Sequence, residues 1–157
     1  IPKELSMLVS LETLYLKGDY LTGSIPTSFF FATSLTGLNL SVNKLIGTIS
    51  EDVVNLKQIK ALSFGENELT GSIPDSLYKL RTLKSLWLGG NKISSGLTTG
   101  LGYLQNLTHL WLESNNFGGS IPSEIGLMKS LQVLDLRNNN FEGVIPPTLA
   151  NLDGLSK

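Results

Sequence analysis

The residues best suited to chemistry stand at a regular spacing, mostly in the second half of the chain. Trp87, Trp111 and Asp135 follow one another at steps of 24 residues, and further polar residues lie two positions from them. Tryptophan among polar neighbours is typical of interface hot spots and of surfaces on which sugars stack. Carboxylates accept hydrogen bonds and a guanidinium donates them in a fixed fork, so such neighbours can orient a partner. The predicted partner-binding set is Tyr15, Trp87, His109, Trp111, Glu113, Asp135 and Arg137.

The same residues allow other interpretations. Paired tryptophans can stabilise a sheet by cross-strand packing without binding a partner. Ser85, His109 and Asp135 have the side chains of a hydrolase triad, but no nucleophile-elbow or oxyanion motif accompanies them. Glu113 and Asp135 would lie about 7–8 Å apart, within the separation that inverting glycosidases use. An open sheet gives neither carboxylate a dry cleft, so we expect no catalytic residues and no enzyme.

The composition narrows the function classes. The 157 residues carry a formal net charge of −1, which gives no long-range attraction to nucleic acid or to an anionic membrane. The chain has no cysteine and one histidine, which excludes a disulfide framework, a thiol nucleophile and a multi-histidine metal site. Apolar stretches all fall short of the roughly 18 residues of a membrane-spanning helix. We therefore expect no cofactor, no metal, no nucleic-acid partner and no membrane insertion by this segment.

Leucine, at 31 of 157 residues, points to internal repeats. The pattern Leu-x-x-Leu-x-Leu returns every 24 residues without insertion or deletion, and its alternating apolar positions predict a short strand with one buried face. Stacked units would form a solenoid with a parallel sheet, and the residues between the strand leucines would point outward from it. The pattern begins at Leu11, Leu35, Ile59, Leu83, Leu107 and Leu131.

Each repeat also carries residues that predict the rest of its turn. An asparagine, replaced by Asp19 in the first repeat, follows the strand, and its amide can both donate to and accept from unpaired backbone groups. A Gly-x-Ile-Pro element then predicts a tight bend and the end of extended pairing. Two repeats depart from it, with Ser50 in place of proline and Ser95 in place of glycine. Apolar residues three positions apart after the proline predict short 3₁₀ turns.

Glycines and aromatic residues give more local expectations. Gly89 and Gly90 leave space beside Trp87, which favours a groove there. Small residues predict a flat and bare centre of the sheet, and they are Gly37, Ala61, Ser63 and Gly65. On the opposite side the predictions are a core position for Phe29, half-buried positions for Phe30 and Phe31, and ordinary surface positions for Tyr78 and Tyr103.

The repeat resembles the plant-type leucine-rich repeat, whose unit reads LxxLxLxxNxLxGxIPxxLxxLxx, over essentially the whole chain. The resemblance implies an α/β-type repeat solenoid, a right-handed superhelix with a concave parallel β-sheet and a convex side of 3₁₀ and irregular segments. We expect one domain, with half a repeat in residues 1–10, six full repeats in 11–154 and the start of a seventh in 155–157. Family members usually carry cysteine-paired caps. We therefore expect a fragment whose ends are covered by flanking repeats or partner subunits, and which is not a stable monomer alone.

Domains of this kind are typically extracellular recognition modules, such as the ectodomains of receptor-like kinases and receptor-like proteins. The resemblance thus implies non-catalytic binding of a protein or peptide, or alternatively of carbohydrate, through the concave sheet. The other function considered is architectural, as a rigid spacer or scaffold subunit in a larger assembly. An extracellular location would make two N-glycosylation sequons relevant, and Asn106, in a loop, is a better acceptor than Asn39, in an outward strand column.

Overall fold

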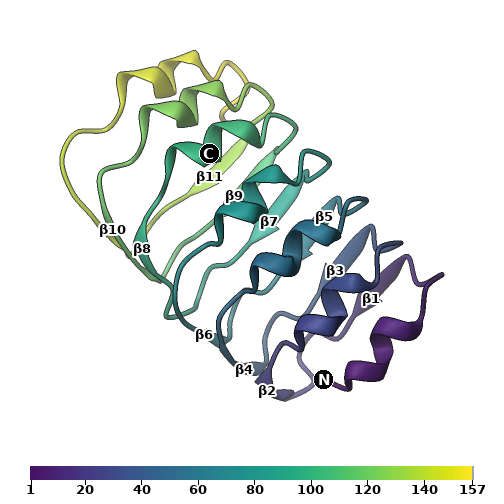
Figure 1. Ribbon diagram of the computed structural model, residues 1–157. Helices are drawn as coiled ribbons and strands as arrows, with labels where there is room; N and C mark the ends of the chain where they lie inside the picture. The colour runs from purple at the N-terminus through teal and green to yellow at the C-terminus, as the bar shows by residue number, and fades with distance from the viewer. Residues whose placement is uncertain (157) are drawn as a thin grey trace.

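The computed structural model describes residues 1–156, except for the side chain of Ser6. Six short parallel strands form one continuous sheet, and the repeats stack from the N-terminus to the C-terminus (Figure 1). Their central leucines pair in register, from Leu14 with Leu38 to Leu110 with Leu134. In sheet order the strands are β1 (Thr13–Tyr15), β3 (Gly37–Asn39), β5 (Ala61–Ser63), β7 (Ser85–Trp87), β9 (His109–Trp111) and β11 (Val133–Asp135). The predicted solenoid with one strand per 24-residue repeat is confirmed.

Each repeat then continues into a second layer of strands, which is interrupted in the middle. One three-stranded sheet contains β2 (Thr22–Ser24), β4 (Lys44–Gly47) and β6 (Glu68–Leu69), and another contains β8 (Ser94–Gly96), β10 (Asn116–Gly119) and β12 (Asn140–Phe141). The interruption coincides with the repeat in which Ser95 replaces glycine. Ser95 has a φ of 112°, and the glycines at the same place in the other repeats have φ between 69° and 84°. The predicted bend is therefore present throughout, and it is unfavourable at Ser95 because a side chain there restricts positive φ.

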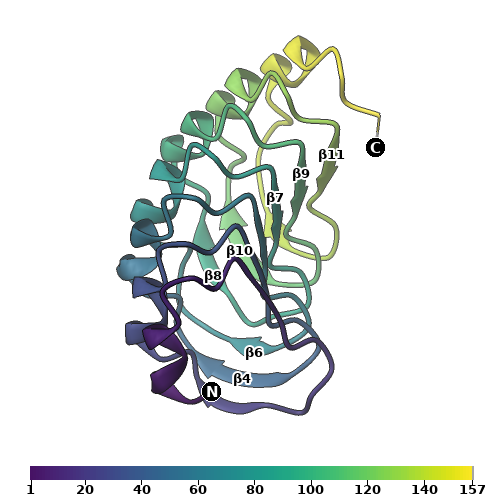
Figure 2. The same cartoon turned by 90° about the vertical axis from the view of Figure 1, so that its right-hand side faces the viewer.

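Short 3₁₀ helices line the side opposite the six-stranded sheet (Figure 2). They are η1 (Lys3–Met7), η2 (Thr27–Phe31), η3 (Glu51–Asn55), η4 (Asp75–Lys79), η5 (Thr99–Tyr103), η6 (Ser123–Leu127) and η7 (Pro147–Asn151). Most of them begin directly after a proline, whose fixed φ suits the entry into the turn. Before η3, Ser50 replaces the proline, and its hydroxyl oxygen accepts a hydrogen bond from the Asp52 backbone N–H at 3.1 Å. The predicted 3₁₀ turns are confirmed.

The repeated asparagines form an internal ladder that joins successive repeats. The Asn91 amide nitrogen donates to the carbonyls of Leu88 in its own repeat, at 2.9 Å, and of Phe64 in the preceding one, at 3.1 Å. Its oxygen accepts from the Leu69 N–H at 2.9 Å. The other ladder residues repeat this arrangement, and they are Asn43, Asn67, Asn115 and Asn139. Asp19, which replaces the asparagine in the first repeat, is exposed and makes none of these side-chain hydrogen bonds.

The leucine columns and several aromatic rings fill the space between the two layers. Phe29 is fully buried, as predicted, and Phe31 is exposed. Three predictions were wrong: Phe30 and Phe31 are not half-buried, since one is fully buried and the other exposed, and Tyr78 is only 2% exposed. The Tyr78 ring lies against Gly100, where a Cβ atom would be 2.7 Å from Tyr78 Cδ2. Burial removes the Tyr78 hydroxyl from water and raises its pKa to about 12.

Candidate functional site

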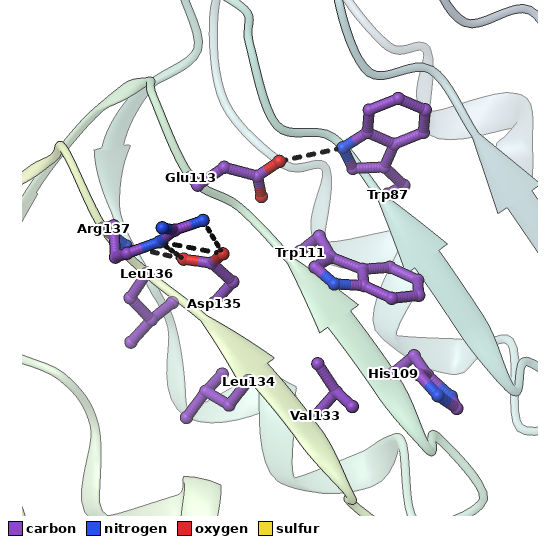
Figure 3. Close-up of a pocket in the computed structure, with 9 residues that line it drawn as sticks. All are labelled: Trp87, His109, Trp111, Glu113, Val133, Leu134, Asp135, Leu136 and Arg137. Carbon is purple, nitrogen blue, oxygen red and sulfur yellow. Dashed lines mark hydrogen bonds and ion pairs between the residues drawn. The ribbon is translucent and has the colours of Figure 1, made fainter. Parts of the chain in front are cut away.

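The outer face of β7, β9 and β11 carries a pocket of about 770 Å³ (Figure 3). The parallel register places Trp87 beside Trp111 and Trp111 beside Asp135. Such a volume lies within the range of small-ligand pockets. The lining residues are Trp87, His109, Trp111, Glu113, Val133, Leu134, Asp135, Leu136 and Arg137. Six of the seven residues in the predicted partner-binding set therefore come together in one place.

Tyr15, the seventh residue of that set, lies apart from the pocket. It belongs to β1, three strands from β7 in the sheet, and its side chain is 65% exposed. Its ring covers Gly37 on the next strand, where a Cβ atom would be 2.9 Å from the tyrosine hydroxyl oxygen. The sheet therefore presents an isolated tyrosine at one end and the pocket towards the other.

The Trp87 indole lies over Gly65, which follows β5 in the neighbouring repeat. A Cβ atom at position 65 would be 2.7 Å from Trp87 Nε1, far inside ordinary contact, so only glycine leaves room for this ring. The prediction of a bare sheet centre was thus wrong at Gly37 and Gly65. Rings from adjacent repeats cover both glycines because strand side chains lean across to the next strand.

Glu113 occupies the space that was predicted to form a groove beside Trp87. Its carboxylate lies over Gly89, and a Cβ atom there would be 2.5 Å from Glu113 Oε2. Trp87 Nε1 donates a hydrogen bond to Glu113 Oε1 at 3.1 Å, which fixes the indole and the carboxylate relative to each other (Figure 3). Among the described residues, Glu113 Oε2 is buried and has no hydrogen-bond partner. One oxygen of this carboxylate is therefore buried beside the pocket without a hydrogen bond.

His109 packs against Trp111, with ring centroids 5.1 Å apart and a tilt of 32° between the planes. Its Nδ1 lies 2.8 Å from the Thr108 hydroxyl, and that hydroxyl donates its single hydrogen to the Lys84 carbonyl, also at 2.8 Å. We therefore assign the proton of the neutral ring to Nδ1, because the hydroxyl can only accept from it. Nε2 is then a hydrogen-bond acceptor.

Asp135 and Arg137 form an ion pair at the rim of the pocket (Figure 3). Arg137 Nε donates to Asp135 Oδ1 at 2.9 Å and Nη2 donates to Oδ2 at 2.7 Å. These hydrogen bonds, together with the carboxylate charge, raise the pKa of the guanidinium. The Asp135 side chain is 17% exposed and that of Arg137 is 78% exposed, so the arginine covers the aspartate and balances its charge.

An apolar wall completes the pocket, and its residues were not among those predicted. Val133 pairs with His109 in the sheet register and shares its outward column, so this position was recognisable from the spacing. Leu134 and Leu136 belong to the core-facing leucine columns, which the sequence pattern assigns to the interior. Both are only half-buried because β11 is the last strand of the described sheet, where it pairs with β9 alone.

The bonding pattern of the polar groups favours binding rather than proton relay. His109 Nδ1 is directed to Thr108, and Asp135 is held by Arg137, so these two residues do not form the orienting pair of a hydrolase triad. Within residues 1–156, histidine and the acidic residues form no group of three or more that could hold a metal ion. No helix in this part of the chain has the length and apolar character needed to cross a membrane.

The two sequons lie in different environments. Asn106 is exposed between η5 and β9, and its amide donates to the Arg81 carbonyl at 2.8 Å. Asn39 lies half-buried in β3, and its oxygen accepts hydrogen bonds from the backbone N–H and the hydroxyl of Ser41 at 3.0 and 2.6 Å. Ser41, the third residue of that sequon, is fully buried.

Models of the leucine-rich repeat family match residues 33–93, 106–128 and 130–152. These segments cover more than half of the chain, and they coincide with the strand, asparagine-ladder and 3₁₀ units described above. The chain therefore belongs to the leucine-rich repeat family, and its repeat is of the plant type.

Solved plant receptor structures have the same fold. The ectodomain of the Arabidopsis thaliana receptor kinase GASSHO1/SCHENGEN3 is 35% identical with a TM-score of 0.97, over 99% of this chain and 19% of its own length. The Arabidopsis receptor kinase HAESA is 38% identical with a TM-score of 0.94, over 98% of this chain and 26% of its own. For the Arabidopsis thaliana SOBIR1 ectodomain the identity is 33% and the TM-score 0.78, over 83% of this chain and 72% of its own.

This chain thus spans about a fifth to a quarter of the length of the larger receptor chains that it resembles. A comparison with curated protein sequences gives no match.

Proposed function

We propose that this chain is a non-catalytic recognition module that binds a peptide or protein ligand on the concave sheet, as part of an extracellular receptor-like protein. The observation that carries the proposal is the pocket, in which both tryptophans and an ion pair stand on a rigid sheet. Rigid aromatic side chains lose little conformational entropy when a partner covers them. They are also enriched among the residues that dominate binding energy.

The structural relatives support a peptide ligand. GASSHO1/SCHENGEN3 was crystallised with CASPARIAN STRIP INTEGRITY FACTOR 2, and HAESA with the peptide hormone IDA and the co-receptor SERK1. In this chain, Tyr15 is three strand steps from Trp87, about 14 Å along the sheet. About four or five residues of extended peptide would cover that distance. We therefore include Tyr15 as a second contact point for a ligand that crosses the strands.

The experiment that tests this proposal selects ligands from a displayed library of random twelve-residue peptides and measures their affinity for single variants. Trp87→Ala and Trp111→Ala should each weaken binding at least tenfold, because truncating a buried hot-spot tryptophan costs about 2–4 kcal/mol. Tyr103→Ala is the matched control, since Tyr103 is 61% exposed but lies on η5, on the other side of the molecule.

Melting temperatures of the three variants check that the fold is retained. Equal peptide affinity in all three variants would overturn the concave pocket as the recognition surface. Peptides that depend on Tyr103 alone would favour an architectural role that uses the convex side.

A further inference from the structure

The pocket contains a carboxylate, that of Glu113, which forms no ion pair among the described residues. Glu113 Oε1 accepts a hydrogen bond from Trp87 Nε1, which is a neutral donor, and Oε2 is buried without a hydrogen-bond partner. A buried carboxylate oxygen without a partner is costly, and a donor supplied by a ligand would remove that cost. The pocket is therefore prepared for a group that donates hydrogen bonds, and a positively charged group gains most.

Arg137 attracts Glu113 at longer range, but its ion pair is with Asp135. Arg137 directs Nε and Nη2 to Asp135, and the described residues contain no ion pair between Arg137 and Glu113. Besides His109, the titratable lining groups are the carboxylates of Glu113 and Asp135 and the guanidinium of Arg137, which carry two negative charges and one positive charge. The net charge of the pocket is negative, so an anionic ligand group would meet repulsion unless it displaced Asp135 from Arg137.

The aromatic rings beside Glu113 also suit a cation. Trp87 and Trp111 stand on adjacent strands, and the faces of indole rings attract cations electrostatically. His109 packs against Trp111, and its Nδ1 proton is directed to the Thr108 hydroxyl. Its Nε2 is a second acceptor for an N–H group. Both acceptor residues and both tryptophans line the same pocket, with Trp111 drawn between Glu113 and His109 (Figure 3).

We propose that this pocket binds the basic side chain of a peptide ligand, with the ammonium of lysine or the guanidinium of arginine bonded to the Glu113 carboxylate and placed against Trp111. The inference rests on the proposed function, because it assigns a chemical class to the ligand residue that enters the same pocket. The long aliphatic part of either side chain would lie against the apolar wall formed by Val133 and Leu134.

The two tryptophans give a direct readout, because a ¹⁵N-labelled chain has two indole N–H signals and both indoles line the pocket. The probes are the amides of Nα-acetyl-arginine and Nα-acetyl-lysine, with the Nα-acetyl-citrulline amide as the uncharged isostere of arginine. The Nα-acetyl-glutamate amide serves as the anionic probe. Both cationic probes should shift the indole signals saturably in the millimolar range, and citrulline should bind at least tenfold more weakly.

The variant Glu113→Gln removes the charge but keeps an oxygen that can accept from Trp87, so it should lower the affinity for the arginine probe at least tenfold. The matched control is Glu66→Gln, because the Glu66 carboxylate lies beside Gly90 in the same way but does not line the pocket. It should leave the affinity unchanged.

Equal binding of citrulline and arginine, tighter binding of the glutamate probe, or unchanged affinity in Glu113→Gln would overturn the inference. The proposed function fails separately, if library peptides bind the Trp87→Ala and Trp111→Ala variants as well as the parent. Peptides that need the tryptophans but keep their affinity in Glu113→Gln would overturn only the assignment of a basic residue.

Discussion

Substituting Gly65 with alanine should move the Trp87 indole without disturbing the fold. Gly65 has no positive φ, so its backbone accepts a side chain. The added Cβ atom would be 2.7 Å from Trp87 Nε1, and non-bonded carbon contacts are optimal near 3.5–4.0 Å. The ring must therefore retreat by roughly 1 Å. Such a shift breaks the 3.1 Å hydrogen bond between Trp87 Nε1 and Glu113 Oε1.

The energetic effect follows from that hydrogen bond. A bond to a charged group contributes about 1.5–3 kcal/mol when buried, but Trp87 is half-exposed and water can replace part of it. We expect a loss of about 1 kcal/mol in the free energy of unfolding, which corresponds to a melting temperature lower by about 2–4 °C. Peptides that require Trp87 should bind more weakly.

The assay compares the indole N–H signals of the parent and the variant, after Trp111→Phe has assigned the single remaining signal to Trp87. The matched control is Gly96→Ala, because a Cβ atom there would make an ordinary 3.5 Å contact with the Gly118 carbonyl oxygen. An unchanged Trp87 signal in Gly65→Ala would refute the reasoning. A melting temperature equal to that of Gly96→Ala would refute the energetic part.

Four further outcomes are expected. Asn91→Ala should lower the free energy of unfolding by about 3–5 kcal/mol, because it leaves buried backbone groups of Phe64, Leu69 and Leu88 without these partners. Urea unfolding measures this loss, and the control Asp19→Ala should change the free energy very little. Ser95→Gly should raise the melting temperature by about 2–3 °C by relieving the φ of 112°, and a fall would contradict this. The Tyr78 hydroxyl has a pKa near 10 in the unfolded chain and of about 12 in the folded one. The free energy of unfolding should therefore fall by about 2–3 kcal/mol as the pH rises from about 10 to about 12, and Tyr78→Phe should lessen this fall. When the chain is expressed with an added secretion signal in a eukaryotic host, glycosidase treatment should lower the mass of the parent and of Asn39→Gln, but not that of Asn106→Gln.

The positions of strands, bends and outward columns were predictable because each repeat imposes the same backbone path. The leucine alternation assigned Trp87, Trp111 and Asp135 to one face, and the register brings them side by side. The positive-φ bend was readable from the recurring glycine, even where Ser95 replaces it. These features depend on residue type and spacing within a repeat.

The directions of the side chains were not predictable in the same way, since they depend on the neighbouring repeat. Gly65 and Gly89 read as open space in the sequence, whereas Trp87 and Glu113 from the following repeats fill that space. The burial of Tyr78 did leave a signal. In the six full repeats its column contains only apolar residues and glycine besides the tyrosine, and they are Phe30, Val54, Gly102, Gly126 and Ala150.

Trp87 and Glu113 each lie over a glycine of the preceding repeat, and this pairing has a consequence for engineering. Tyr15 and Glu66 lie instead against Gly37 and Gly90 of the following repeat. A designer who exchanges a single repeat for another would transfer a tryptophan or a glutamate without the small residue that accommodates it. The junction would then carry a steric conflict on the ligand-facing surface while the leucine core remained intact. Chimeras of this chain should therefore exchange adjacent repeats in pairs, so that each side chain is transferred with the glycine that it covers. Two consecutive repeats are then the smallest segment that can transfer binding specificity.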